Sequence, residues 1–281
     1  MINSIKRNLY AACFRTFPAF ASAAREYRQG ATKAHRSGFG LDLVGPKYLI
    51  DSGFEQDEIR LVREQLRDVD VFVDVGANIG IYTCLAASLG KKVVAVEPLA
   101  SNLRSLYQNI RANSLTGVEV FPMGLAASPG LTVLKGIGAQ ASFLPDWAVR
   151  EYKFNQQIET VCPTTTLDTI LANRFAGQRL FIKVDVEGFE YQVLSGAAAT
   201  LERCPRPAWM VECILDQFHP DNRNPNFEKT FGMFFDRGYS AWSASQDGVA
   251  VDREKVHEWA SRGSVPHDGP GIGFNFFFRA G

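Results

Sequence analysis

The sequence predicts an α/β fold in which helices cover both faces of a mostly parallel sheet. Short apolar runs at 71–75, 92–96 and 180–184 are each followed by a segment with helical spacing. Runs of this kind are typical of parallel strands buried on both faces, and their alternation with helices indicates a parallel sheet. Two late runs, 239–244 and 273–278, are expected to form strands that pair antiparallel.

The first predicted strand runs directly into a glycine-rich turn. Gly76 and Gly80 follow the strand at 71–75, with Asn78 between them, and a helix begins after the turn. A dinucleotide-binding loop needs Gly-x-Gly-x-x-Gly, and a P-loop needs Gly-Lys-Ser/Thr, so this turn belongs to neither class. Asp74, at the carboxyl end of the strand, would repel a pyrophosphate. It suits a cationic group, such as the amino group or sulfonium of S-adenosylmethionine.

The second predicted strand, at 92–96, also ends in an acid, Glu97. An acid about twenty residues past a glycine-rich turn is placed to hold a ribose diol. A carboxylate that accepts hydrogen bonds from both hydroxyls gains roughly 1.5–3 kcal/mol from each. In the alternative interpretation, Asp74 and Glu97 only cap helices and the glycines only turn the chain.

The strand predicted at 180–184 ends in a cluster of opposite charges. Strand alternation puts Lys183 and Asp185 on the same side, with Glu187 just beyond in the turn. Buried carboxylates beside a lysine have perturbable pKa values, which makes them candidates for proton transfer. The alternative is a structural ion pair that closes the end of the sheet.

A further strand at 207–213 contains the acid Glu212 near its end. Asp185, Glu187 and Glu212 together could hold a divalent cation, although the favoured prediction is that no metal is bound. The four histidines are too scattered to form a metal-ligand spacing.

The middle of the chain carries weaker signals. Residues 124–130 are turn-rich, and an adenine ring is expected between their small side chains, near Gly124. Residues 136–160 lose periodicity and are interpreted as a lid or acceptor-binding loop, or alternatively as a floppy insert. Residues 47–51 are expected to form a small strand.

Charge is balanced over the chain, which gives no reason to expect a nucleic-acid partner. Residues 1–40 nevertheless carry a net charge of +6 among scattered aromatic and aliphatic side chains. We therefore predict a basic, helical extension over residues 1–45. It either makes peripheral contact with a membrane surface or a partner, or packs as an ordinary helix or frayed tail. The cysteines form no Cys-x-x-Cys pair and no apolar run is long enough to span a bilayer, so the predicted location is cytoplasmic.

Taken in order, these motifs resemble FkbM-type methyltransferases, a family of S-adenosylmethionine-dependent enzymes. The matching blocks are 73–80 with Tyr82 and Thr83, 96–98 with Asn102 and Asn109, 166–168, and 182–190 with Val193, Leu194 and Gly196. The likeness spans about residues 54–245. The glycine turn and the Glu-Pro pair are common to class I methyltransferases, whereas Lys-x-Asp-x-Glu-Gly-x-Glu narrows the likeness to this family.

The resemblance implies a Rossmann-like class I methyltransferase domain, placed at 46–281, with a seven-stranded, mostly parallel sheet whose last strand is antiparallel. It implies O-methylation of a hydroxyl on a sugar, a glycan or a polyketide-like product. By position, the residues expected to hold the cofactor are Asp74, Gly76, Ala77, Asn78, Gly80, Tyr82, Thr83, Glu97, Pro98, Asn102 and Gly124.

For catalysis, the resemblance puts Asp185 where an acid of the family faces the transferring methyl group. Our hypothesis is that Asp185 accepts the proton of the acceptor hydroxyl, while Lys183 keeps it ionised and Glu187 orients the loop. The sequence departs from the family at Ala126 and Ala127, where an acid often lies near the adenine. A different class of function remains open, a non-catalytic S-adenosylmethionine-binding module that regulates or scaffolds a glycan-modifying complex.

Overall fold

The structure is a computed structural model that describes residues 34–50, 55–148, 158–245, 248–265 and 273–281. The helical extension predicted for residues 1–45 lies outside the described residues as far as residue 33. From residue 34 the chain forms a short antiparallel pair of strands, β1 (His35–Arg36) and β2 (Asp42–Leu43). None of the helices in these described ranges is long and apolar enough to cross a bilayer.

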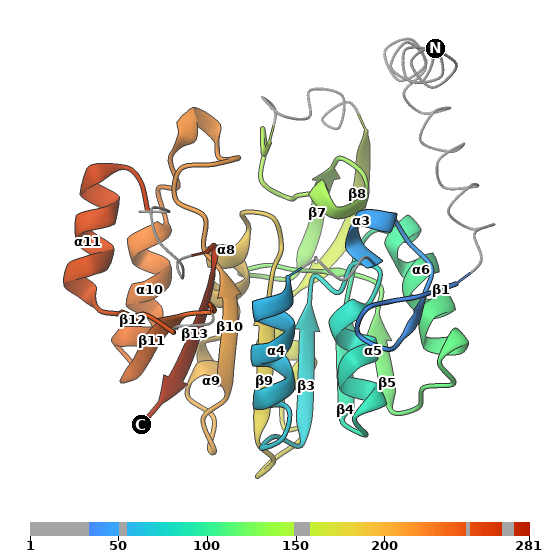
Figure 1. The fold of residues 1–281 in the computed structure, drawn as a ribbon. Helices are drawn as coiled ribbons and strands as arrows, with labels where there is room; N and C mark the ends of the chain where they lie inside the picture. The colour runs from blue at the N-terminus through green and yellow to red at the C-terminus, as the bar shows by residue number, and fades with distance from the viewer. Residues whose placement is uncertain (1–33, 51–54, 149–157, 246–247, 266–272) are drawn as a thin grey trace.

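The described residues form a central sheet of eight strands in the order β12-β11-β13-β10-β9-β3-β4-β5 (Figure 1). Its strands are β3 (Val71–Val75), β4 (Lys92–Val96), β5 (Val118–Phe121), β9 (Leu180–Val184), β10 (Ala208–Glu212), β11 (Tyr239–Ser243), β12 (Ala250–Val251) and β13 (Asn275–Ala280). The neighbouring strands β5, β4, β3, β9 and β10 are parallel to one another. Strand β13 is antiparallel to both β10 and β11. The predicted α/β fold is confirmed, with β12 as a short additional edge strand.

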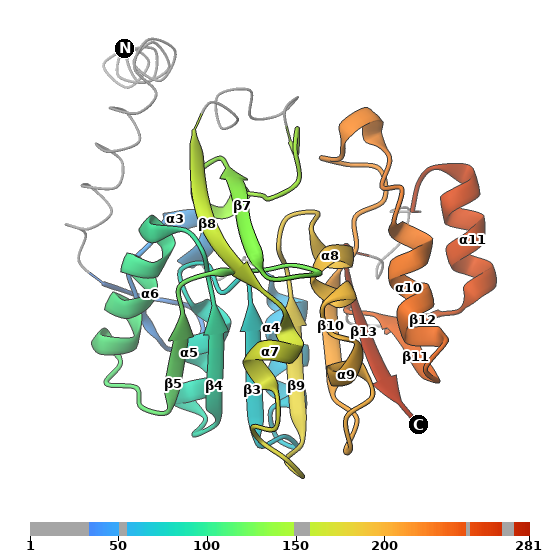
Figure 2. The same cartoon turned by 180° about the vertical axis from the view of Figure 1, so that it is seen from behind.

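Helices cover both faces of this sheet (Figure 2). The main helices are α4 (Gln56–Gln65), α5 (Ile81–Ser88), α6 (Ala100–Ala112), α7 (Leu167–Leu171), α8 (Glu190–Ser195), α9 (Ala198–Leu201), α10 (Phe227–Phe235) and α11 (Arg253–Arg262). The first three pack on one face, and α7 to α11 pack on the other.

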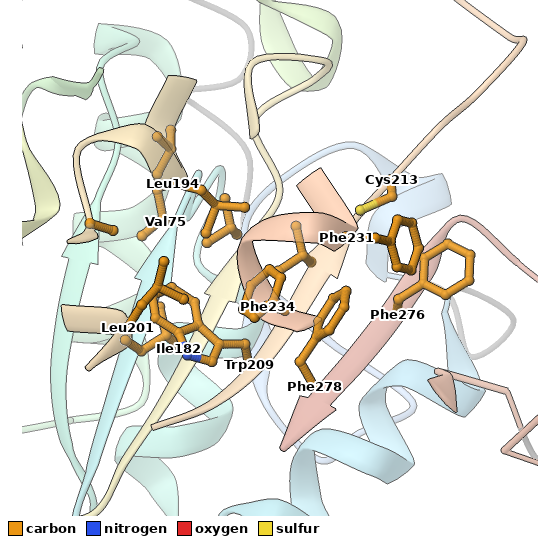
Figure 3. Packing of buried hydrophobic residues seen from close by; sticks show 14 of the residues in the cluster. Val75, Ile182, Leu194, Leu201, Trp209, Cys213, Phe231, Phe234, Phe276 and Phe278 are labelled. Atoms are coloured by element: carbon orange, nitrogen blue, oxygen red, sulfur yellow. The ribbon is translucent and has the colours of Figure 1, made fainter. Parts of the chain in front are cut away.

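Strand alternation divides the apolar side chains between two cores. Phe72 of β3 packs with Phe181 of β9 on the α4 and α5 side, with 5.5 Å between the ring centroids. Val73, one position on, points into the opposite core. Figure 3 shows that second core, where the rings of Phe234 and Phe278 stack with centroids 3.9 Å apart. Because helices cover both faces of the sheet, a ligand can reach it only at the ends of the strands.

The prediction of a small strand at 47–51 is wrong, because this segment forms the helical turn α3 (Lys47–Ile50). The Leu49 N–H donates to the carbonyl of Pro46 at 3.0 Å, and Leu49 and Ile50 are both buried. Two consecutive buried side chains suit a helical turn against a core better than a strand, whose neighbouring side chains point to opposite faces.

A second, three-stranded sheet lies above the carboxyl ends of the main strands (Figure 2). Its strands are β6 (Gly124–Leu125), β7 (Gly130–Lys135) and β8 (Glu159–Thr165). We refer to β7 and β8 as the ribbon; they pair antiparallel from Gly130 opposite Thr164 to Lys135 opposite Glu159. The aperiodic loop predicted over 136–160 connects the two strands of the ribbon. Residues 149–157 of it lie outside the described residues, and residues 159 and 160 belong to β8.

Candidate active site

A cavity of about 250 Å³ lies at the carboxyl ends of the parallel strands. Loops after β3, β4, β5 and β9 line it, together with the end of β10 and the connection that follows β7. The chain runs from β3 to β4 and β5 on one side and then returns to β9 on the other. A crevice at such a reversal is where open α/β sheets bind ligands.

The glycine turn after β3 is fixed by close backbone contacts. Gly76 has φ +81°, and a Cβ built there would lie 1.8 Å from the carbonyl oxygen of Asp185. Gly80 has φ +87°, and its Cβ would lie 2.3 Å from Leu106 Cδ1. The N–H groups of Gly76 and Ala77 both donate to the carbonyl of Val96 at 3.0 Å. Glycine is therefore needed at Gly76 for space as well as for conformation, and at Gly80 for conformation.

Asp74 is placed behind the cavity rather than on its wall. Its side chain is buried, and Oδ2 accepts a hydrogen bond of 2.6 Å from the hydroxyl of Thr83 in α5. Oδ1 is also buried and has no hydrogen-bond partner in the structure. Burial raises the pKa of Asp74 above its ordinary value. Asp74, Gly80 and Thr83 are the predicted cofactor residues that do not line the cavity.

Glu97 lines the cavity and is held by three donors. Oε2 accepts from the Asn78 N–H at 2.8 Å, while Oε1 accepts from the Leu99 N–H at 2.9 Å and from Asn102 Nδ2 at 3.2 Å. Burial raises the pKa of Glu97 to about 7, although these hydrogen bonds oppose the shift. A carboxylate has about four acceptor sites, so further donors can still bind.

The structure brings Lys183 and Asp185 together at the end of β9, on the other side of β3 from Glu97. Lys183 Nζ lies 2.6 Å from Asp185 Oδ2 and 4.7 Å from the centroid of the Tyr82 ring. The hydroxyl of Tyr82 donates to Glu55, which the sequence analysis did not identify. Burial alone would lower the pKa of Lys183, but the carboxylates of Asp185, Glu55 and Asp74 hold it above its ordinary value. Burial raises the pKa of Glu55 to about 7.

Glu187 is fixed by the connection between β7 and β8. Trp147 Nε1 donates to Glu187 Oε2 at 2.9 Å, and the hydroxyl of Ser142 donates to the backbone carbonyl of Glu187 at 2.6 Å. A Cβ on Gly188 would lie 2.4 Å from the Trp147 ring, so the indole packs directly on the loop. Burial and the charge of Asp185 both raise the pKa of Glu187 well above its ordinary value.

Glu190 supports the same loop from below by accepting the N–H groups of Val186 at 3.0 Å and Gly188 at 3.1 Å. Glu212, at the end of β10, lines the cavity, and its Oε2 is buried without a hydrogen-bond partner. Burial, with the charges of Asp185 and Glu187, raises the pKa of Glu212. The cavity is therefore lined by the carboxyls of Glu55, Asp185, Glu187 and Glu212. Among the described lining residues, Lys183 is the single lysine.

The alternative cation site at Asp185, Glu187 and Glu212 finds no support in the described ranges. No group of three or more His, Cys, Asp or Glu side chains there is arranged to hold a metal ion. His219 lies nearby, but it packs edge-on against Trp147 with 4.8 Å between ring centroids and does not line the cavity. Burial lowers the pKa of His219 to about 4, which favours the neutral imidazole.

The geometry agrees with a comparison against known protein families. The sequence model of the methyltransferase FkbM domain matches residues 74–241. The chain belongs to the FkbM methyltransferase family. This confirms the resemblance to the family that the sequence motifs indicate.

Two curated proteins are similar to this FkbM methyltransferase. The chain is 31% identical over 150 residues to the hexuronic acid methyltransferase AglP of Haloferax volcanii, with 53% of this chain and 58% of that protein covered. It is 28% identical over 228 residues to the AMB antimetabolite synthetase AmbE of Pseudomonas aeruginosa, with 65% of this chain and 10% of that protein covered. The chain thus spans less than two thirds of the length of either protein.

Among solved structures, precorrin-6y C5,15-methyltransferase from Geobacter metallireducens GS-15 is similar at 11% identity and a TM-score of 0.43, over 85% of this chain and 93% of that one.

Most predicted site residues of this FkbM methyltransferase meet in the cavity, and the structure adds others. Eleven of the predicted residues line it: Gly76, Ala77, Asn78, Tyr82, Glu97, Pro98, Asn102, Gly124, Lys183, Asp185 and Glu187. Glu55 and Trp147 were missed because neither belongs to a strand-end motif. Glu212 carried such a signal, as an acid at the end of a strand, but it was considered only as a metal ligand.

Proposed function

We propose that the protein transfers a methyl group from S-adenosylmethionine to a hydroxyl of a sugar, a glycan or a polyketide-like product. The observation that carries the proposal is that one cavity is lined both by Glu97 and by the Lys183 and Asp185 pair. Glu97 can accept hydrogen bonds from the hydroxyls of a nucleoside, and the Lys183 and Asp185 pair can take a proton from the acceptor. Similarity to a hexuronic acid methyltransferase supports a sugar as the acceptor.

The residues present fit S-adenosylmethionine. Asn78 lines the cavity, and its buried Oδ1 has no hydrogen-bond partner in the structure, so a ligand donor would satisfy it. Glu97 would accept the ribose hydroxyls, and Gly76 would let the backbone approach the methionine part. Gly124, between Met123 and Leu125 on the cavity wall, offers backbone groups and apolar surface to the adenine.

S-adenosylmethionine supplies a methyl group activated by its positively charged sulfur. The chain's own work is to hold the acceptor in line, which can contribute roughly 7–11 kcal/mol, and to remove the hydroxyl proton. Asp185 is the proposed base, since its Oδ2 is anchored by Lys183 and its side chain reaches the cavity. A base of this kind is worth about a hundred- to ten-thousandfold in rate.

The test is incubation of the purified full chain with methyl-labelled S-adenosylmethionine and a panel of sugars, glycans and polyketide-like alcohols. We expect label on a hydroxyl oxygen, located by NMR of the product. Binding of S-adenosylhomocysteine should be measured in parallel by calorimetry. Binding without transfer to any acceptor would favour the non-catalytic module, and absence of binding would refute the proposal as a whole.

A further inference from the structure

The peptide bond between Glu187 and Gly188 is held from both sides. Its carbonyl accepts a hydrogen bond of 2.6 Å from the hydroxyl of Ser142, and its N–H donates to Glu190 Oε1 at 3.1 Å. The carbonyl and the N–H of a trans peptide point in opposite directions, so the two partners hold opposite edges of one rigid plane. The plane therefore cannot rotate without breaking both hydrogen bonds.

The backbone at this peptide needs support from its surroundings. Glu187 has φ +56°, a left-handed conformation that few residues other than glycine adopt and that persists where neighbouring groups enforce it. Gly188 has φ +88° and no Cβ, so its own conformational preference does not fix the orientation of the peptide. The orientation therefore depends on the contacts that other residues make with this peptide, among which Ser142 supplies the donor to the carbonyl.

Ser142 is anchored to the ribbon. Its backbone N–H and carbonyl both form hydrogen bonds of 2.9 Å with the backbone of Lys135, the last residue of β7. Its hydroxyl oxygen accepts the N–H of Leu144 at 2.9 Å, which leaves the O–H to donate to the carbonyl of Glu187. The Ser142 side chain is buried and does not line the cavity, although the residues on either side of it do. Ser142 thus connects the ribbon to the loop after β9.

We infer that Ser142 is a positioning residue for methyl transfer, because it fixes the 187–188 peptide and, through it, the loop that carries Asp185 and Glu187. The inference rests on the proposed function, in which Asp185 is the base. Both of these side chains reach the cavity, so a loop that rotated at this peptide would present them in more than one arrangement. Methyl transfer depends on alignment, and a misplacement of about 1 Å can cost about a hundredfold in rate.

Amide hydrogen exchange, followed by NMR on the ligand-free full chain, tests the inference without an acceptor. The Gly188 amide should be protected, and Ser142→Ala should raise its exchange rate at least about tenfold, since the peptide then loses one of its two partners. Ser243→Ala is the matched control, because this buried serine of β11 accepts the Val249 N–H at 2.9 Å outside the cavity. It should leave the exchange of Gly188 unchanged.

Exchange of Gly188 that is equally fast in the two variants would overturn the inference. An unprotected Gly188 amide in the unmodified chain would do the same, even if Ser142→Ala failed to fold.

Kinetics separate positioning from a purely structural role. With an acceptor found in the methyl-transfer assay, Ser142→Ala should lower kcat at least about tenfold and change the affinity for S-adenosylhomocysteine by no more than about threefold. Ser243→Ala should change neither quantity. An unchanged kcat in Ser142→Ala, or a loss confined to the affinity for S-adenosylhomocysteine, would refute the positioning role. Failure of the unmodified chain to bind S-adenosylhomocysteine would count against the proposed function instead, so the two failures are distinguishable.

Discussion

Lys183 Nζ lies 2.6 Å from Asp185 Oδ2, and this contact joins the end of the buried strand β9 to the loop that follows it. The lysine side chain is almost fully enclosed, with 3% of its area exposed, whereas that of Asp185 has 23% exposed toward the cavity. One partner is thus an anchor and the other is accessible. The pair holds a carboxylate in a fixed orientation at the place where a proton would be removed.

Asp185→Asn should therefore separate binding from turnover. The amide has nearly the same shape but cannot serve as a base at neutral pH. We expect turnover to fall about a hundred- to ten-thousandfold, with the affinity for S-adenosylhomocysteine changed by no more than about threefold. Initial rates and calorimetry measure the two quantities. Turnover equal to that of the unmodified protein would remove Asp185 from the role of base.

Gly76→Ala tests the close contact between the glycine turn and the loop after β9. Its Cβ would lie 1.8 Å from the Asp185 carbonyl oxygen, in addition to the strain of φ +81°. Gly90→Ala is a matched control, because φ is +76° but no atom lies within 4 Å. The control should cost about 1–2 kcal/mol of unfolding free energy. Gly76→Ala should cost clearly more and weaken S-adenosylhomocysteine binding, so equal costs would contradict the contact.

Thr83→Val tests the partner of Asp74. The substitution keeps the branched shape but removes the hydroxyl that donates to Oδ2 at 2.6 Å. A buried carboxyl left without this donor should cost about 1–3 kcal/mol of unfolding free energy in denaturant titrations. Thr83→Ser keeps the hydroxyl and should cost less. If Val and Ser variants are equally stable, the hydrogen bond contributes nothing to the folded state.

Trp147→Phe tests the donor to Glu187. The phenyl ring retains apolar contact with the loop, but the N–H that lies 2.9 Å from Glu187 Oε2 is lost. We expect the catalytic efficiency for the acceptor to fall about tenfold, while the affinity for S-adenosylhomocysteine stays unchanged. Trp242→Phe, outside this cavity, is the control and should leave both quantities unaltered. A loss confined to the affinity for S-adenosylhomocysteine would show that Trp147 acts in cofactor binding instead.

The pH dependence of stability follows from the buried acids. Burial raises the pKa of Glu55, Glu97 and Glu190 from 4.5 to about 7 in the folded protein. Between these values the folded protein binds more protons than the unfolded chain, so its stability falls as the pH rises. The stabilisation is fully present below about pH 4.5 and is lost as the pH passes about 7. His219, whose pKa is lowered to about 4, acts in the opposite direction.

Urea titrations of the ligand-free chain between about pH 5 and about pH 8 measure this slope. We expect the free energy of unfolding to decrease across the range by an amount on the order of several kcal/mol. Glu97→Gln should flatten the slope by removing one of these titrations. A stability that rises steadily over the same range would contradict the burial argument.

Much of the site could be predicted because the central strands leave little choice. An apolar run such as 71–75 must be buried on both faces, and its last residue must reach the carboxyl edge of the sheet. The direction of the Asp74 side chain could not be predicted in the same way. The same strand position allows a carboxylate to face a ligand or to accept from Thr83 on the following helix, and only packing decides between them.

The ribbon was missed for a different physical reason. Leu131, Val133 and Val161 lie on its exposed face, with 75%, 40% and 64% of their area accessible. Apolar side chains therefore do not mark the buried face of these strands. Gly130 and Pro163 also weaken the strand signal at its base. Glu55 gave no signal at all, because it reaches the cavity only through the position at which α4 begins.

The ribbon also bears on how enzymes of this architecture diversify. Its two strands pair over six residues and hold both ends of the intervening connection side by side, independently of the main sheet. Lengthening a connection with fixed ends costs little, since each doubling adds only about 0.6 kcal/mol of closure entropy. Segments of different length and composition could be exchanged there during evolution, or by grafting in the laboratory, provided that residues 138–147, which contact Asn102 and Glu187, are retained.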